Sequence, residues 1–139
     1  MIKLYTDAAT LGNPGPSAAG ILIVTAKKQY QFSIPLPPVD NHIAEFMAVQ
    51  LGLEKIATLA LTESLLQINV DSKIVCQSLE KQYAKHYQQY VDQIIALEQP
   101  YSLVLHQWLP DRQNKGAHHL AQQALKKIVI KNMAFRNGF

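Results

Sequence analysis

The hydrophobic residues change their period along the chain, and this change decides which class of fold is available. At the start of the chain, Ile2, Leu4 and Thr6 occupy alternate positions, which is typical of a strand with one buried face. From residue 42 to residue 60 the apolar residues recur every three or four positions, which is typical of an amphipathic helix. Alternation returns at residues 66–70. A strand, a helix and a strand in this order normally form a right-handed crossover between parallel strands, so we expect an α/β fold.

The other segments complete a mixed five-stranded sheet, flanked by helices, with the element order βββαβαβα, in which the α between the fourth and fifth strands comprises two helical segments. The predicted strands cover residues 1–7, 18–24, 30–34, 66–70 and 101–108. The predicted helices cover residues 42–60, 72–80, 83–98 and a final segment that begins near Ala117. The proline-rich loop Pro35–Pro38 is too short to separate two domains. We therefore expect one domain over residues 1–139, with a basic tail after about residue 129 for which the pattern predicts no structure.

Composition excludes several classes of protein. Of the 139 residues, 48% are apolar and 17% are charged, which suits a chain with an ordinary buried core. The longest apolar run, Ala18–Val24, is too short to span a bilayer, and Asp7 lies where a signal peptide needs apolar residues. The single cysteine, Cys76, excludes an intramolecular disulfide framework and a cysteine-only zinc site. We expect a cytoplasmic monomer without a membrane partner.

Basic residues are concentrated towards the end of the chain. Residues 1–111 carry seven lysines and ten acids, a net charge of −3, whereas residues 112–139 carry six basic residues and no acid. Such a basic segment is typical of contact with phosphate groups, although a solvated helix face can have the same composition.

Three acids are candidates for a common site. Asp7 and Asp71 each end a predicted strand, and if these strands are parallel neighbours their carboxylates emerge at the same edge of the sheet. Glu45 lies in the predicted first turn of the connecting helix. Carboxylates this close cannot all stay ionised without a cation, and oxygen ligands without thiolates suit Mg²⁺ or Mn²⁺. The sequence therefore predicts a divalent metal site, provided that the helix brings Glu45 to the same edge.

Four segments resemble, in order, the four sequence motifs of the type-one ribonuclease H family. They are Asp7–Pro16, Asn41–Val49, Val70–Val75 and Trp108–Ala121. The resemblance extends from residue 2 to about residue 125, and the predicted element order is that of the ribonuclease H fold.

The resemblance implies an endonuclease that hydrolyses the RNA strand of RNA–DNA hybrids with two Mg²⁺ ions and leaves a 5′-phosphate. It also implies roles for the residues that match the motifs. Asp7 would bridge both ions, and Glu45 and Asp71 would complete the coordination of one of them. Two cations about 4 Å apart suit an in-line displacement at phosphorus.

The fourth motif departs from the family at His118, which stands where the family usually has an aspartate. In the family this residue helps to hold the ion that activates the water, so the resemblance implies a metal-binding and catalytic role for His118. A neutral imidazole binds Mg²⁺ poorly and suits softer ions, so we expect weak activity in Mg²⁺ and stronger activity in Mn²⁺. The same departure supports an alternative, in which the domain binds nucleic acid with its chemistry weakened or lost.

Family residues that contact the sugar–phosphate backbone of the substrate are matched by Asn13, Asn41 and His42. The turn that contains Gly12 can offer backbone amides to the substrate, and Lys73 follows Asp71 closely enough to meet it. A protein distinguishes RNA from DNA chiefly through the 2′-hydroxyl, which polar groups reach in the shallow minor groove. A second alternative is a 3′ exonuclease of the same broad fold. Such an enzyme usually carries a glutamate two residues after the first aspartate, where this chain has Ala9.

Overall fold

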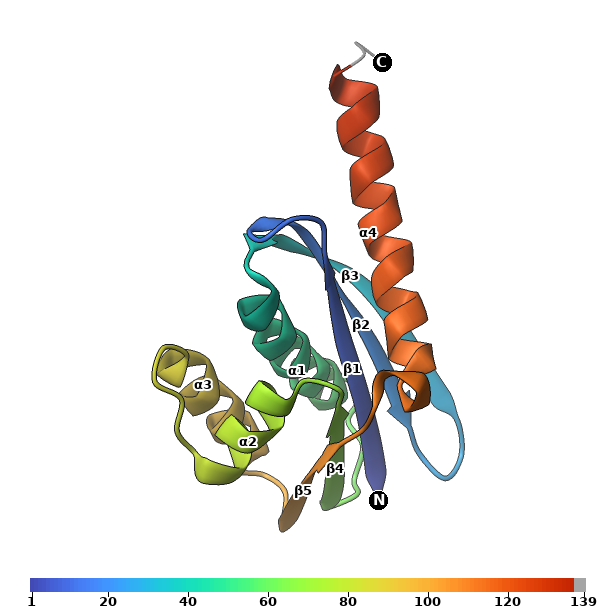
Figure 1. The fold of residues 1–139 in the computed structure, drawn as a ribbon. Helices are drawn as coiled ribbons and strands as arrows, with labels where there is room; N and C mark the ends of the chain where they lie inside the picture. Colours follow the sequence, from blue (N-terminus) through green and yellow to red (C-terminus); the bar gives the residue numbers. More distant parts are fainter. Residues whose placement is uncertain (137–139) are drawn as a thin grey trace.

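The computed structural model describes residues 1–136, and Figure 1 shows a five-stranded sheet with helices on both faces. The strands are β1 (Ile2–Thr10), β2 (Gly15–Val24), β3 (Gln29–Val39), β4 (Leu65–Val70) and β5 (Leu103–Trp108). The helices are α1 (Asn41–Thr58), α2 (Lys73–Lys81), α3 (Gln88–Glu98), the short 3₁₀ helix η1 (Asp111–Gln113) and α4 (Lys115–Arg136). This order confirms the predicted α/β class and the predicted succession of elements.

The strands lie in the order β3-β2-β1-β4-β5. β2 pairs antiparallel with β1 and β3, whereas β4 pairs parallel with β1 and β5. β1, β2 and β3 form an antiparallel meander, and the parallel pairing of β1 with β4 agrees with the crossover through α1. β1 therefore lies at the centre of the sheet, between its antiparallel and parallel parts.

Helices α1, α2 and α3 cover one face of the sheet, and α4 covers the other (Figure 1). The main core lies between α1 and the central strands, where Phe46 and Leu53 belong to the same buried cluster as Ile2 and Leu4. On the other face, α4 packs on β1, β2 and β3 through a smaller cluster of alanines and Leu125. Within residues 1–136, no helix combines the length and the apolar composition that crossing a bilayer requires.

The start of α4 approaches β2 closely because Gly20 has no side chain. A Cβ atom at Gly20 would lie 1.9 Å from the carbonyl oxygen of Ala117, in the first turn of α4. Any larger residue would therefore push the start of α4 away from the sheet. Gly20 is the register partner of Asp7, so this contact places the first turn of α4 beside the strand position that carries the acid.

Three strands are clearly longer than the sequence predicts, and one of them, β2, begins at Gly15 and not at residue 18. β1 does not end at Asp7 but continues to Thr10, because it still pairs with β2 beyond the acid. β3 continues to Val39 and includes Pro35–Pro38, for which the sequence predicts a loop. An edge strand tolerates prolines because its outer N–H groups need no partner, and β3 is an edge strand.

Among the helices, α3 and α4 differ most from their predicted bounds. α3 begins at Gln88, not at residue 83, because Tyr87 packs on Phe46 from a non-helical position, with the ring centroids 5.3 Å apart. Tyr83 consequently lies outside the helix and is exposed. The basic tail, for which the sequence predicts no structure, is helical as far as Arg136, and residues 137–139 lie outside the described residues. In Figure 1 this last part of α4 extends beyond the sheet.

Candidate active site

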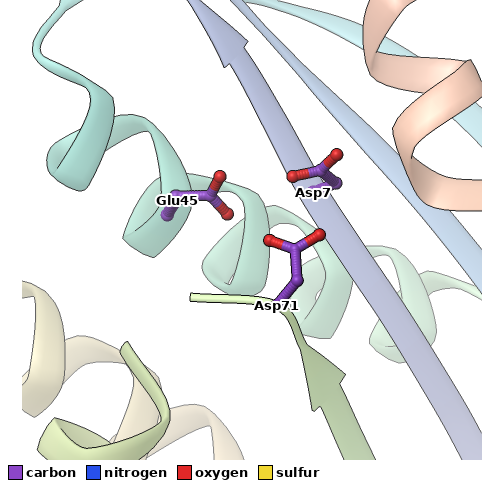
Figure 2. A group of neighbouring side chains, drawn as sticks. All are labelled: Asp7, Glu45 and Asp71. Atoms are coloured by element: carbon purple, nitrogen blue, oxygen red, sulfur yellow. The ribbon is translucent and has the colours of Figure 1, made fainter. Parts of the chain in front are cut away.

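Three acidic side chains from three different elements point towards one another (Figure 2). Asp7 comes from β1, Glu45 from α1, and Asp71 directly follows β4. One carboxylate oxygen from each residue lies within 4.8 Å of the other two. Asp7 is buried, and Glu45 and Asp71 are half-buried. The structure thus brings the three acids named by the sequence into a single cluster.

The cluster forms where β4 ends and β1 continues. The two parallel strands pair as far as Thr6 and Val70, so Asp7 and Asp71 are the next residues along each strand. Beyond this point β1 pairs with β2 alone, with Asp7 opposite Gly20. Because β4 has ended there, no strand lies beside Asp7 on that side of β1, and the side chain of Glu45 from α1 can approach.

α1 presents its acid one turn later than the sequence predicts. The helix begins at Asn41, with Asp40 as its N-cap, because the Asp40 carboxylate accepts a hydrogen bond of 2.8 Å from the Ile43 N–H. The first turn contains no acid, so Glu45 lies in the second turn and not in the first. It still reaches the other two carboxylates.

Burial and mutual repulsion raise the pKa of two of the acids. The pKa of the Glu45 carboxyl is well above its usual 4.5, first because the surrounding protein removes water from the carboxyl group and then because of the charges of Asp7 and Asp71. Burial raises the pKa of Asp71 from 3.8 to about 6; a hydrogen bond from Asn114 opposes the rise, and the charge of Asp7 adds to it. A cation between these groups would relieve the repulsion, and three carboxylates without a thiolate fit a hard divalent ion such as Mg²⁺ or Mn²⁺.

His118 lies beside the acids, in the first turn of α4. Its Nδ1 atom is 2.9 Å from Oδ2 of Asp7, and 58% of its side chain is exposed. The other oxygen of Asp7, Oδ1, accepts a hydrogen bond of 2.9 Å from the Ala8 N–H. The neighbouring His119 contacts its own helix, with Nε2 3.1 Å from Nε2 of Gln123. Of these two adjacent histidines, His118 is therefore the one that joins the cluster.

Two residues that the sequence reasoning did not place in the site contact Asp71. Nδ2 of the buried Asn114 donates to Oδ2 of Asp71 at 3.0 Å and to the carbonyl oxygen of Thr6 at 2.8 Å. The indole Nε1 of Trp108 donates to the carbonyl oxygen of Asp71 at 3.0 Å, and Nζ of Lys73 lies 5.0 Å from the centre of the Trp108 ring. The only signal in the sequence is that Trp108 and Asn114 both fall within the fourth motif.

The residues expected to contact nucleic acid lie on three segments. Gly12 and Asn13 lie in the loop between β1 and β2, Asn41 and His42 begin α1, and Lys73 begins α2. The side-chain oxygen of Asn13 accepts a hydrogen bond of 3.0 Å from the N–H of Asn41, which joins the first two segments. Their contact with a substrate stays a prediction.

Comparisons with known proteins identify a matching family model and similar sequences. The model of the reverse transcriptase-like family matches residues 5–124. A protein of Enterococcus faecalis (strain ATCC 700802 / V583) named "Putative hydrolase EbsB" is 43% identical over 130 residues, which cover 92% of this chain and 96% of that protein. The ribonuclease H of Trichodesmium erythraeum (strain IMS101) is 36% identical over 86 residues, which cover 62% of this chain and 52% of that protein. The alignment with this second relative thus spans only about half of its length.

The fold is also similar to that of a solved structure. The crystal structure of LC11-RNase H1 in complex with an RNA/DNA hybrid superposes with a TM-score of 0.84, covering 93% of this chain and 99% of that one. The sequences are 21% identical, so this similarity concerns the fold. The mixed five-stranded sheet and its order are those of ribonuclease H structures.

Proposed function

Because this chain belongs to the reverse transcriptase-like family, we propose that it is a metal-dependent endonuclease that hydrolyses the RNA strand of RNA–DNA hybrids. The observation that carries the proposal is the cluster of Asp7, Glu45 and Asp71. Two similarities support it: a relative is named ribonuclease H, and the fold resembles that of LC11-RNase H1, whose crystal structure contains an RNA/DNA hybrid. The similarity to EbsB over most of the chain agrees with a hydrolytic reaction.

The three acids would hold divalent cations, and we expect two Mg²⁺ ions, with Mn²⁺ as an alternative. When bound, the ions lower the pKa of a water nucleophile and neutralise the charge that develops on the scissile phosphate. Asp7 lies between Glu45 and His118, so its carboxylate is placed to serve both parts of the site. Since carboxyls must lose their protons to bind a cation, ion binding should strengthen as the pH rises through about 6, the pKa of Asp71.

Hydrolysis breaks the bond between phosphorus and the 3′-oxygen, and it leaves a 5′-phosphate on one RNA fragment and a 3′-hydroxyl on the other. The attacking water loses one proton, and the leaving oxygen gains one. Because Nδ1 of His118 contacts Asp7, Nε2 is the ring nitrogen that remains to hold or accept a proton. The exposed position of this ring gives it access to a water molecule.

Recognition of the hybrid would use the residues on the three segments described above. Backbone N–H groups at Gly12 and the side chains of Asn13 and Asn41 suit phosphate oxygens and 2′-hydroxyls, and Lys73 supplies a positive charge for a phosphate. The hydrogen bond from Asn41 to Asn13 presents the first two segments as one surface, and His42 follows directly. A monomer acting in the cytoplasm is also part of the proposal and rests on the sequence alone.

One observation favours an alternative function, in which the domain binds hybrids but cleaves them weakly or not at all. Beside the three acids lies an imidazole, His118, where the ribonuclease H motif that this segment resembles usually has a carboxylate. The cluster then has one negative charge fewer with which to attract a second cation.

Cleavage of a hybrid with 5′-labelled RNA, first in Mg²⁺ and then in Mn²⁺, distinguishes the two functions. Asp7→Asn should not cleave in either metal. Asp92→Asn is the matched control, because Asp92 is an exposed acid on α3 outside the cluster, and it should cleave as the wild type does. Wild-type protein that binds the hybrid and cleaves it in neither metal would refute the nuclease and establish the alternative.

A further inference from the structure

The segment between β5 and α4 carries one buried amide side chain into the region of the acids. Asn114 is 1% exposed, and its Nδ2 donates two hydrogen bonds. One goes to the carbonyl oxygen of Thr6, the residue before Asp7 in β1, at 2.8 Å. The other goes to Oδ2 of Asp71, at 3.0 Å. A single amide group therefore connects the strand that carries one acid with the carboxylate of another.

The backbone of Asn114 is fixed on both sides. Its N–H donates to the carbonyl oxygen of Asp111 at 3.0 Å, and its carbonyl oxygen accepts from the N–H of His118 at 3.1 Å. The second bond belongs to the first turn of α4, which Gly20 allows to lie close to the sheet. Asn114 thus connects the Asp71 carboxylate to β1 through its side chain, and to the turn that carries His118 through its backbone.

Asp71 is held at its main chain as well. The indole Nε1 of Trp108 donates to the Asp71 carbonyl oxygen at 3.0 Å, and the N–H of Leu109 donates to the Val70 carbonyl oxygen at 2.8 Å. These bonds fix the backbone at the end of β4. The bond from Asn114 then fixes the carboxylate, taking up one of its two oxygens.

We propose that Asn114 is a positioning residue that holds the Asp71 carboxylate inside the acidic cluster, with Trp108 holding the main chain beneath it. Three carboxylates within 4.8 Å of one another repel each other, and Asp71 is half-exposed at the end of a strand, so without a donor its carboxylate would turn towards water. This inference rests on the proposed metal-dependent function. It makes the hydrogen bond from Asn114 to Asp71 a condition for tight ion binding, and this role requires no contact of Asn114 with the ion or the substrate.

The test measures Mg²⁺ affinity by calorimetry without nucleic acid, and then the Mg²⁺ dependence of hybrid cleavage. Groups that orient metal ligands typically change metal affinity about 10- to 100-fold when removed, and we expect a loss of this size for Asn114→Ala. Cleavage by this variant should recover at high Mg²⁺, with the KM for the hybrid changed by less than about twofold, because no substrate contact is removed. Trp108→Phe, which keeps an aromatic ring and removes the indole N–H, should show a smaller loss of affinity. Gln113→Ala, at the exposed neighbouring position, should bind Mg²⁺ as the wild type does.

The outcomes separate this inference from the function on which it rests. Folded Asn114→Ala with wild-type Mg²⁺ affinity overturns the inference and leaves the nuclease intact. Wild-type protein that neither binds the ions nor cleaves overturns both. If Asn114→Ala does not fold, Asn114→Leu keeps most of the side-chain volume and removes both hydrogen bonds. If that variant also fails, unchanged affinity in Trp108→Phe overturns the inference, and reduced affinity supports it.

Discussion

Replacing Asp71 with asparagine should stabilise the protein in the absence of divalent ions, and the gain should grow with pH. The pKa of this carboxyl rises from 3.8 to about 6 in the folded protein, mainly because the group is buried. Between about pH 4 and pH 6 the folded protein therefore binds more protons than the unfolded chain, so the free energy of unfolding falls as the pH rises through this range. The destabilisation that the ionised Asp71 causes is absent at lower pH and fully present above about pH 6.

The magnitude follows from the size of the shift. At about 1.4 kcal/mol for each pKa unit, the upper limit is about 3 kcal/mol. Because Asp71 is half-exposed, solvent screening reduces this figure, and we expect a gain of about 1–2 kcal/mol near pH 7.5. In a chain of 139 residues this corresponds to a Tm increase of about 4–8 °C. Asparagine keeps a side-chain oxygen that can accept from Asn114, so the hydrogen bond at this position is retained.

The assay follows thermal unfolding of the wild type and of Asp71→Asn in EDTA from about pH 5 to pH 8. The difference between the two proteins reports the titration of Asp71 together with its effect on Glu45, whose pKa the charge of Asp71 helps to raise. Asp92→Asn, which removes an exposed acid, should follow the wild type at every pH. Added Mg²⁺ should reduce the difference, since bound ions compensate the charge of the wild-type cluster. A difference that stays constant with pH, or a variant less stable than the wild type near pH 7.5, would refute the electrostatic reasoning.

Three further changes test the rest of the site. Asp7→Asn should abolish hybrid cleavage and leave the circular dichroism spectrum unchanged, and cleavage at a near wild-type rate would remove Asp7 from the metal site. His118→Asp should raise the rate in Mg²⁺, on the order of a hundredfold if an interaction of about 3 kcal/mol is restored, whereas an unchanged or lower rate would make His118 an adapted part of the site. Neutralising Lys126, Lys127 and Lys131 together should flatten the salt dependence of hybrid binding, by about 0.9 in the slope of log K against log salt for each phosphate that these lysines neutralise in the wild type. An unchanged slope would mean that these lysines are solvated and that binding uses other segments.

The meeting of the acids could be predicted because it depends on strand order. Alternation that stops at Asp71, followed by a short helix, marks a strand end, and the crossover rule places that strand parallel to the one that carries Asp7. The extent of β1 could not be predicted in the same way. Residues 8–10 are held in the strand by pairing with β2, a contact with a distant segment that leaves no periodic signal in the sequence.

The residues that hold the acids were beyond the reach of pattern analysis for a related reason. The side-chain amide of Asn114 donates to Thr6 and Asp71, which lie far away in the sequence, so nothing in the neighbourhood of Asn114 indicates these partners. The predicted helix over residues 83–98 begins too early because Tyr83 and Tyr87 have helical spacing in the sequence, although the helix starts only at Gln88. Local periodicity therefore predicted the elements, whereas the contacts between them required the fold.

The two edges of the sheet would respond differently to an additional strand. β3 carries Pro35, Pro37 and Pro38, which have no N–H to donate, so a strand arriving on that side meets an interrupted row of donors. β5 contains no proline and leaves Leu103 and Leu105 exposed beside its unpaired edge. We therefore expect concentrated or partly unfolded protein to self-associate through the edge of β5 and not through the edge of β3. Replacing Leu103 or Leu105 with lysine should prevent this self-association without disturbing the acidic cluster.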